Sequence, residues 1–497
     1  MHPRSRTTIL LLLLLLSGVS PAAGDGPAAG PGGPDAAPAT PRLDAALRRM
    51  AARGVRAGVL VTDARGRVLA ERNADRPLVP ASTMKLLTTA CALDLLGPSW
   101  TTSTDFLVAS APDEQGRVAG PLWVRGGGDP LLLAEDLWAA VQELRALGVR
   151  AVAGLGADAG LFPGPPQPPS WRSRPPVPDP YAAPQGALSL AWNSLEVVVR
   201  PGATGGEPAR VDVFPLRGAV GIVNRATTGP ATSLRIELDP SPDHRTRIVV
   251  RGSIPPGAAP HREWVHLHDP ARALLGGLRR LLLDAGIAVD GPLRFGTVPA
   301  GAREIVRRKS RPLAELVRAI NKFSSNFGAE VLLRHLGATT RAGRRETAQG
   351  LEAVRACLDR WRVPRARLVL ADGSGYAPAD RLTARALVAV LDASRRHPEW
   401  GPELLVSLPR AAEDGSLTHR LAALAGRVRA KTGSLSGASA LAGELLRRDG
   451  SPLLFAILVN GPPAAVPRQA ADGVLVALAG DLDAAASTPP GGTTARP

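Results

Sequence analysis

Residues 79–87 read Val-Pro-Ala-Ser-Thr-Met-Lys-Leu-Leu and place Ser82 three residues before Lys85. The apolar pattern that follows predicts a helix over residues 82–96, which a Gly-Pro pair ends. Side chains three residues apart share one face of a helix, so the hydroxyl and the amine are expected to be neighbours. A serine hydroxyl needs an adjacent base to act as a nucleophile, and a desolvated lysine can be that base. The pattern S-x-x-K alone is common by chance.

Lysine is rare in this chain, since only four of its 60 lysine and arginine residues are lysine. Arginine serves well as a surface charge, but it cannot lose its proton and cannot act as a base. Lys309 lies in an Arg-Arg-Lys run that is typical of an ordinary basic surface. The other three lysines lie in short polar motifs, so we treat them as candidates for chemistry: Lys85, Lys322 and Lys431.

Two further motifs follow the first one along the chain. Residues 321–326 read Asn-Lys-Phe-Ser-Ser-Asn, which alone would fit a polar turn between helices, and residues 431–434 read Lys-Thr-Gly-Ser. The Lys-Thr-Gly-Ser motif is predicted at a strand edge, where Gly433 allows a substrate backbone to approach. In this order, S-x-x-K, S-x-N and K-T-G are the signature of penicillin-binding proteins and serine β-lactamases. The site residues that we predict from these motifs are Ser82, Lys85, Ser324, Asn326, Lys431, Thr432, Gly433 and Ser434.

Composition and patterning divide the chain into six parts. Residues 1–23 are typical of a secretory signal, with two arginines before an apolar run that is too short to span a membrane. Residues 24–41 are predicted to be a Pro/Gly/Ala-rich linker, and residues 484–497 a disordered tail. Strands and helices at both ends predict two halves of one α/β (α+β) domain, residues 42–99 and 296–483, separated by a mostly β insertion over residues 100–295.

An extracytoplasmic, periplasmic location follows from the signal and makes nucleic acid an improbable partner despite the net charge of +16. No stable membrane span is expected after removal of the signal.

Two cysteines do not make a disulfide framework, and we favour buried free thiols over one bridge for Cys91 and Cys357. His266 and His268 have no third metal ligand at a supporting spacing, and no phosphate-binding loop is present. We therefore expect neither a metal nor an organic cofactor.

With these motifs the chain resembles the serine D-alanyl-D-alanine carboxypeptidases of the penicillin-binding protein 4 type, low-molecular-weight class C, peptidase family S13. The resemblance covers about residues 42–480. More than twice as many residues separate the first motif from the second as the second from the third, and this family fills the first gap with inserted domains. Its other marks are Gly128-Asp129-Pro130, Ala187-Leu188-Ser189-Leu190, Asp372-Gly373-Ser374-Gly375 and Asp414-Gly415.

The resemblance implies a fold like that of serine β-lactamases and penicillin-binding transpeptidases. It also implies that Ser82 attacks the carbonyl between two terminal D-alanines of a peptidoglycan peptide and forms an acyl-enzyme. Lys85 would take the serine proton, Asn326 would hold the substrate amide and orient Lys85, and Ser324 would relay a proton to the leaving amine with help from Lys431. Penicillin and other β-lactams would be inhibitors.

Substrate binding is implied for the third motif. Lys431, Thr432 and Ser434 would bind the terminal carboxylate, and the backbone N–H groups of Ser82 and Ser434 would form an oxyanion hole. Asp158 would either shape a pocket for a diamino-acid side chain or cap a turn. After residues 372–375 the family continues Leu-Ser-Arg, whereas this chain has Tyr-Ala-Pro, so the preference for the stem peptide stays open, with Arg381 as one replacement.

Three functions remain as alternatives on this scaffold. The first is the carboxypeptidase, with endopeptidase activity on cross-links left open. The second is a β-lactamase or esterase, but no motif between Ser82 and Ser324 places a base for fast deacylation. The third is a non-catalytic peptidoglycan-binding module, which would be marked by loss of the serine or of a motif lysine, and neither is lost.

Overall fold

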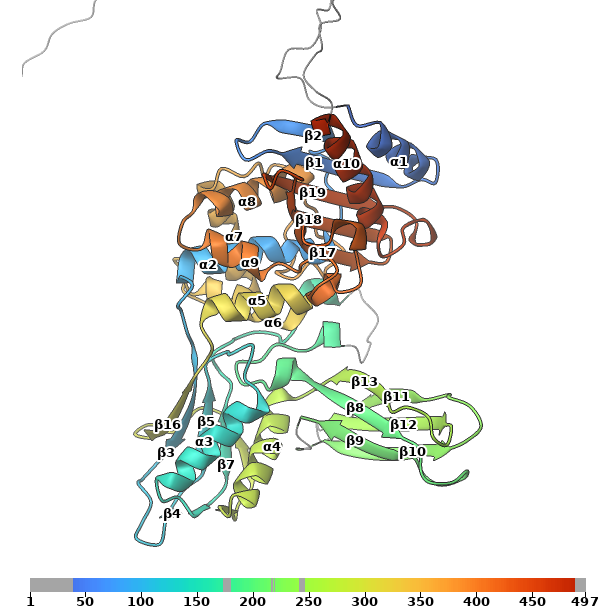
Figure 1. Cartoon of the computed structure of the whole chain (residues 1–497). Coiled ribbons are helices and arrows are strands. Elements are labelled where there is room, and N and C mark those ends of the chain that lie inside the picture. The colour runs from blue at the N-terminus through green and yellow to red at the C-terminus, as the bar shows by residue number, and fades with distance from the viewer. Residues whose placement is uncertain (1–38, 173–179, 216–217, 219, 241–245, 488–497) are drawn as a thin grey trace, which may run out of the picture. The chain divides into compact units, whose positions relative to one another are not determined.

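Strands from opposite ends of the sequence form one antiparallel sheet (Figure 1). We describe a computed structural model that covers residues 39–172, 180–215, 218, 220–240 and 246–487. The predicted signal and most of the predicted linker lie outside the described residues. The sheet has the order β17-β18-β19-β1-β2, and its strands are β1 (Arg56–Thr62), β2 (Val68–Arg72), β17 (Val428–Leu435), β18 (Ala438–Leu446) and β19 (Pro452–Asn460). The predicted joining of the two chain ends in one unit is confirmed.

Alternation of buried residues along these strands gives the sheet two apolar faces. Val59 and Val61 pack on one side against α1 (Pro41–Ala51) and α10 (Ala470–Ser487). Leu60 and alternate residues of β18 and β19 pack on the other side against a group of helices. Those helices are α2 (Lys85–Leu96), α5 (Leu313–Phe323), α6 (Asn326–Gly337), α7 (Thr347–Arg360), α8 (Ala384–Arg396) and α9 (Gly401–Ser407).

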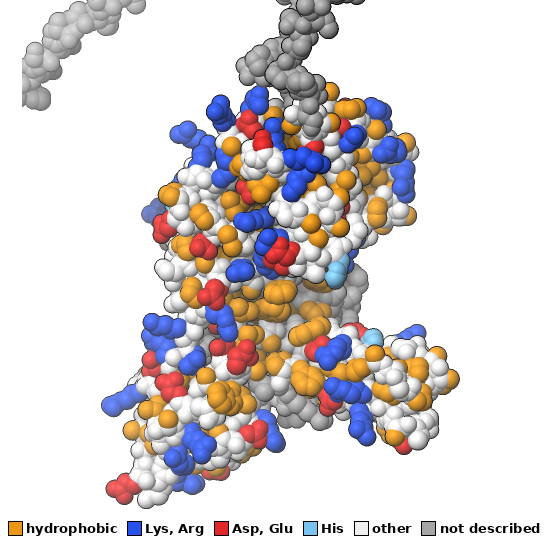
Figure 2. All heavy atoms as spheres, viewed as in Figure 1, with side chains coloured by type: hydrophobic (Ala, Val, Ile, Leu, Met, Phe, Trp, Pro, Cys, Tyr) orange, Lys and Arg blue, Asp and Glu red, His pale blue; other side chains and the backbone are white. Residues whose placement is uncertain are grey.

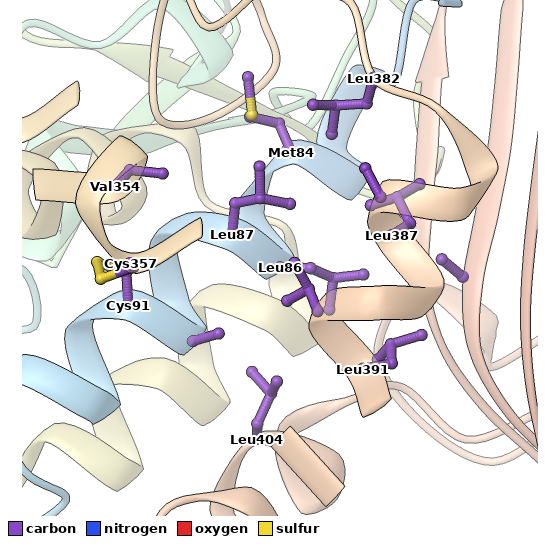
Figure 3. Close-up of a cluster of buried hydrophobic side chains, with 14 of the residues drawn as sticks. Met84, Leu86, Leu87, Cys91, Val354, Cys357, Leu382, Leu387, Leu391 and Leu404 are labelled. Carbon is purple, nitrogen blue, oxygen red and sulfur yellow. A yellow bond between two sulfur atoms is a disulfide. The ribbon is translucent and has the colours of Figure 1, made fainter. Parts of the chain in front are cut away.

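Cys91 and Cys357 form a disulfide, with 2.06 Å between the sulfurs and 5.9 Å between the Cα atoms. The bridge joins α2 to α7 inside the helical core, among Leu86, Leu87 and Val354 (Figure 3). The expectation of free thiols was therefore wrong. Both cysteines lie on buried helix faces, as expected, but only the packing of α7 against α2 brings the sulfurs together across 266 residues of sequence.

The insertion begins with a second five-stranded sheet, of order β15-β7-β5-β3-β16, covered by two helices. The strand β16 (Arg303–Lys309) pairs antiparallel with β3. The inserted sheet therefore extends to Lys309, beyond the predicted end of the insertion at residue 295. The helix α3 was not predicted, although four buried residues at helical spacing mark it. The elements are β3 (Ser103–Val108), β5 (Leu122–Gly126), β7 (Leu155–Asp158), β15 (Leu293–Phe295), β16 (Arg303–Lys309), α3 (Ala134–Ala146) and α4 (Pro270–Asp284).

A small sheet of short strands joins the loops of this region, and two further sheets of three strands each share a core of their own. The four strands expected within residues 195–251 are all present, so the β-rich character of this part is confirmed. The short strands are β4 (Arg117–Val118), β6 (Ala151–Val152) and β14 (Ala288–Val289). The larger ones are β8 (Ser194–Arg200), β9 (Arg210–Phe214), β10 (Gly221–Thr228), β11 (Arg235–Pro240), β12 (Thr246–Ile254) and β13 (His261–His266).

The closing helix α10 begins at Ala470 and continues to Ser487. Residues 484–487 are therefore helical, and the predicted disordered tail cannot begin at residue 484. Within the described residues, no helix has both the length and the apolar character that a membrane crossing requires. Basic side chains are scattered among acidic and apolar ones over the face shown in Figure 2, as expected for a solvated basic surface.

Candidate active site

Ser82 lies in a short 3-10 helix, η1 (Ala81–Met84), and α2 begins only at Lys85. The helix that was expected over residues 82–96 is therefore tighter in its first turn. Side chains at positions i and i+3 of a 3-10 helix eclipse each other, which brings the serine and the lysine together. The distance from Lys85 Nζ to Ser82 Oγ is 2.9 Å. The serine is partly exposed, whereas the lysine is fully buried.

Three oxygen atoms surround the amine of Lys85. Besides Ser82, Nζ donates to Asn326 Oδ1 at 2.6 Å and to the carbonyl oxygen of Ser374 at 2.8 Å. Burial lowers the pKa of Lys85 to about 7, although nearby carboxyl groups act to raise it. A lysine with this pKa has an appreciable unprotonated fraction at neutral pH, as a base must have.

Ser324 forms the turn between α5 and α6. It adopts a left-handed conformation with φ of 58° at the end of α5, and the next residue, Ser325, caps α6 by accepting from the Gly328 N–H at 3.0 Å. The Nζ atom of Lys431 lies 2.8 Å from Ser324 Oγ. Burial, and then the charges of Lys85 and Arg420, hold the pKa of Lys431 well below its ordinary value. The second and third motifs are thus in direct contact, next to the first.

The whole K-T-G motif lies on β17, whose backbone passes close to η1. A Cβ atom added to Gly433 would lie 2.7 Å from the carbonyl oxygen of Pro80 and 3.1 Å from the nitrogen of Ser82. Only glycine therefore allows this approach of the strand to the serine. Thr432 Oγ1 lies 2.7 Å from Ser416 Oγ, and the Ser434 hydroxyl lies 3.3 Å from the carbonyl oxygen of Arg468.

Lys322 gains a partner that its own motif did not indicate. Its Nζ lies 2.6 Å from Asp414 Oδ2 and 2.7 Å from the carbonyl oxygen of Leu408. A Cβ atom at Gly415 would meet the Lys322 backbone at 2.7 Å, so the turn of residues 414–417 packs tightly against the end of α5. Through Ser416 this turn also reaches the K-T-G strand. Lys322 therefore has a structural environment that links the second motif to the third.

Comparison with known proteins identifies the family of this chain. Residues 39–480 match the family described as D-Ala-D-Ala carboxypeptidase 3 (S13). The chain belongs to the S13 family. It is 37% identical over 493 residues to a D-alanyl-D-alanine carboxypeptidase of Actinomadura sp. (strain R39), a match that covers 95% of this chain and 89% of the relative. It is 30% identical to a carboxypeptidase of Mycobacterium tuberculosis, over 89% of this chain and 83% of that protein.

The fold of this S13 chain has a counterpart among solved structures. Penicillin-binding protein 4 of Haemophilus influenzae superposes with a TM-score of 0.75 at 22% identity, over 88% of this chain and 99% of that one. The match includes the sheets beyond the core domain, so the predicted fold class is confirmed.

The two residues named for recognition of the stem peptide have local partners in this S13 enzyme. Asp158 accepts from the backbone N–H groups of Gly160 and Val298, both at 3.0 Å. These contacts match the turn-capping alternative, and a role in substrate binding stays a prediction. The guanidinium of Arg381 donates to the carbonyl oxygens of Pro378 and Asp380, both at 2.7 Å.

A groove of about 740 Å³ opens beside Ser324 and Asn326. Aromatic side chains on its wall come from both the catalytic part and the insertion: Tyr181, Trp192, Trp264 and Phe323. The Asn326 amide donates to the Tyr181 carbonyl oxygen at 2.9 Å, which ties the insertion to the second motif. Among the described residues, no group of three or more His, Cys, Asp or Glu side chains is arranged to hold a metal ion.

Proposed function

We propose that this S13 enzyme is an exported serine D-alanyl-D-alanine carboxypeptidase that acts on peptidoglycan stem peptides through an acyl-enzyme on Ser82. The observation that carries the proposal is the contact of Ser82 Oγ with a buried lysine whose pKa is lowered to about 7. A deprotonated amine at this distance can accept the serine proton as the oxygen attacks. The family membership supplies the substrate class, a peptide that ends in D-Ala-D-Ala.

Acylation begins with the attack of Ser82 Oγ on the carbonyl carbon of the penultimate D-alanine, while the proton of the hydroxyl passes to Lys85 Nζ. Negative charge develops on the substrate oxygen, and we assign the backbone N–H groups of Ser82 and Ser434 as its donors. The C–N bond then breaks, and Ser324 relays to the amine of the leaving D-alanine the proton that Lys85 took, so Lys85 is neutral again before deacylation. Lys431, 2.8 Å from Ser324 Oγ, stabilises the relay.

Deacylation returns the enzyme to its starting state. Water attacks the ester carbonyl, gives a proton to the base, and releases the shortened peptide as Ser82 recovers its hydrogen. We assign Lys431, Thr432 and Ser434 of β17 to the carboxylate of the terminal D-alanine during acylation, as the motif resemblance implies. Asn326 holds the substrate amide while its side-chain oxygen keeps Lys85 in place.

Location and inhibitors follow from the same assignment. The substrate lies outside the cytoplasm, which agrees with the export signal expected at residues 1–23. The ring amide and the carboxylate of a β-lactam take the places of the last peptide bond and the carboxylate of a D-Ala-D-Ala end, so we expect β-lactams to acylate Ser82. The Haemophilus influenzae protein of the same fold was solved in complex with a β-lactam. The groove of about 740 Å³ beside Ser324 is our candidate site for the second peptide strand that D,D-endopeptidase activity on cross-linked peptides would require.

The decisive experiment uses purified full-length protein, fluorescent penicillin and a muropeptide that ends in D-Ala-D-Ala. We expect covalent labelling that Ser82→Ala abolishes, together with release of D-alanine. Labelling that persists in Ser82→Ala would overturn the assignment of the nucleophile. Rapid turnover of penicillin without D-alanine release would instead identify a β-lactamase. Defined cross-linked muropeptides test the endopeptidase activity in the same assay.

A further inference from the structure

Residues 372–375, Asp-Gly-Ser-Gly, form a loop that contacts the catalytic lysine through one carbonyl oxygen. That oxygen, on Ser374, accepts a hydrogen bond from Lys85 Nζ at 2.8 Å. A neutral lysine amine has two hydrogens and one lone pair. If Asn326 Oδ1 and the Ser374 carbonyl take the two hydrogens, the lone pair is left to face the Ser82 hydroxyl. The direction of the Ser374 carbonyl therefore decides whether the base is aimed at the nucleophile.

Asp372 fixes that direction through the adjacent peptide unit. The Ser374 carbonyl and the Gly375 N–H belong to one trans peptide and point in opposite directions. The Gly375 N–H donates to Asp372 Oδ1 at 2.6 Å, which turns the carbonyl away from Asp372 and toward Lys85. The Ser374 N–H donates to the same oxygen at 3.0 Å. The whole turn is thus wound around one buried carboxyl group.

The other oxygen of Asp372 is held by donors from two parts of the chain. Ala377 N donates to Oδ2 at 2.7 Å, and Ser374 Oγ at 3.2 Å. The indole Nε1 of Trp171, which belongs to the insertion, donates to it at 2.8 Å. The Trp171 ring also contacts the ring of Tyr376 edge-on, with 4.9 Å between centroids. The insertion thereby supports the carboxyl group that orients the loop.

Further contacts press the loop against the catalytic turn. Thr88, on the same helix as Lys85, donates from its hydroxyl to the Gly373 carbonyl at 2.7 Å, and the Gly373 N–H donates to Glu330 at 2.9 Å. A Cβ atom at Gly375 would lie only 1.8 Å from the carbonyl oxygen of Ala81. The loop therefore has no room to turn its carbonyl elsewhere.

We propose that Asp372 is a positioning residue for the general base, and that it acts through the Ser374–Gly375 peptide with Trp171 of the insertion holding its carboxyl group. The proposal rests on the proposed function, because it assumes that Lys85 takes the proton of Ser82. It gives the insertion a part in catalysis besides any part in substrate binding.

The charge of Asp372 also acts to raise the pKa of Lys85, and this effect distinguishes a positioning role from simple structural support. Asp372, Glu330 and Asp380 all act to raise the pKa of Lys85 against the effect of burial. Burial, and then the charge of Asp372, raise the pKa of Glu330 to about 8 and that of Asp380 well above its ordinary value. Removal of the Asp372 charge should therefore lower the pKa of Lys85, while loss of the aimed carbonyl should slow the proton transfer.

The test measures acylation by fluorescent penicillin in the full chain, as a limiting rate and an apparent affinity, from about pH 5 to pH 9, the range that brackets the catalytic base. Asp372→Asn keeps only one acceptor oxygen, so its NH2 group must face either the N–H groups of Ser374 and Gly375 or the donors on Trp171 and Ala377. We expect a limiting rate lower by about tenfold or more, with the affinity little changed and the acidic limb of the pH profile moved to lower pH. A wild-type rate, or a slower rate with an unmoved acidic limb, would overturn the proposal.

Trp171→Phe provides the second variant, and it decides the matter if Asp372→Asn does not fold. It keeps an aromatic ring beside Tyr376 and removes only the donor to Asp372, so we expect a several-fold lower limiting rate. The matched control is Trp400→Phe, which removes an indole donor to Asp94 at 3.1 Å in the helical core. Equal rates in Trp171→Phe and the wild type would overturn the role of the insertion. If the wild type itself is not labelled at Ser82, the proposed function fails instead.

Discussion

Lys322 and Asp414, which lie 92 residues apart in the chain, form an ion pair with 2.6 Å between Nζ and Oδ2. The lysine is almost fully buried and also donates to a backbone carbonyl. It lies two residues before Ser324, so the pair holds the end of α5 against the turn that supports the K-T-G strand. This is a structural use of a lysine that the sequence marked as a candidate for chemistry.

Lys322→Met should lower the free energy of unfolding by about 1–3 kcal/mol, because it leaves Asp414 and the Leu408 carbonyl without their donor. Urea denaturation of purified protein measures this change. Lys309→Met is the matched control, since Lys309 is exposed on β16, and it should change stability by no more than about 0.5 kcal/mol. Equal destabilisation by both substitutions would contradict the account of the pair.

Lys85→Arg should abolish labelling by penicillin, because a guanidinium stays protonated and cannot take the proton of Ser82. The extra bulk also has no room in a fully buried position. Lys309→Arg should label at the wild-type rate. If the two variants lost activity to the same degree, the rare lysines would not mark the site.

The acylation rate of the wild type should rise with pH through about 7, where Lys85 loses its proton. The sign follows from the role: the deprotonated amine is the active form, and burial lowers its pKa, so activity is lost on the acidic side. Acylation rates measured across this range at constant ionic strength test the prediction. An acidic limb that sits near the ordinary pKa of a lysine, far above neutrality, would exclude Lys85 as the base.

Gly433→Ala should slow acylation by roughly a hundredfold, the size of effect that a displacement of about 1 Å can produce in an active site. Its Cβ atom would push β17 away from the turn that carries Ser82. Gly473→Ala is the control, because a Cβ atom at that position of α10 meets nothing within 4 Å. The acylation rate per folded molecule distinguishes the two, and a normal rate for Gly433→Ala would show that the strand has freedom to move.

The Cys91→Ala/Cys357→Ala double variant should unfold more easily, by about 2–5 kcal/mol, since a native disulfide restricts the unfolded chain. The shift of the urea midpoint, compared with the oxidised wild type, gives the measurement. The wild type in reductant should move in the same direction once the chain has been unfolded and refolded. An unchanged midpoint in the double variant would mean that the packing of α2 on α7 alone holds these helices.

The sequence could predict the three motifs, their order and the elements that carry them. Each catalytic step needs a particular side chain, such as a hydroxyl or an amine, and the residue types are visible in the sequence. It could not show that the Ser374 carbonyl contacts Lys85, since every residue has a carbonyl oxygen and only the fold directs it. The partner of Lys322 was hidden for a similar reason, because Asp414 is distant in sequence. The helix α3 could have been predicted from the sequence, since Leu137, Val141 and Leu144 have helical spacing.

The bridge between Cys91 and Cys357 encloses the inserted sheets within a covalent loop of the chain. A protease that cuts a surface loop anywhere in the insertion would therefore leave two fragments that stay covalently linked by the disulfide. Such a nicked molecule would keep its labelled Ser82 on the N-terminal fragment, joined by the disulfide to the fragment that carries Lys431. On a gel it would run as one band without reductant and as two with it, so an intact-looking band is no proof of an uncut chain.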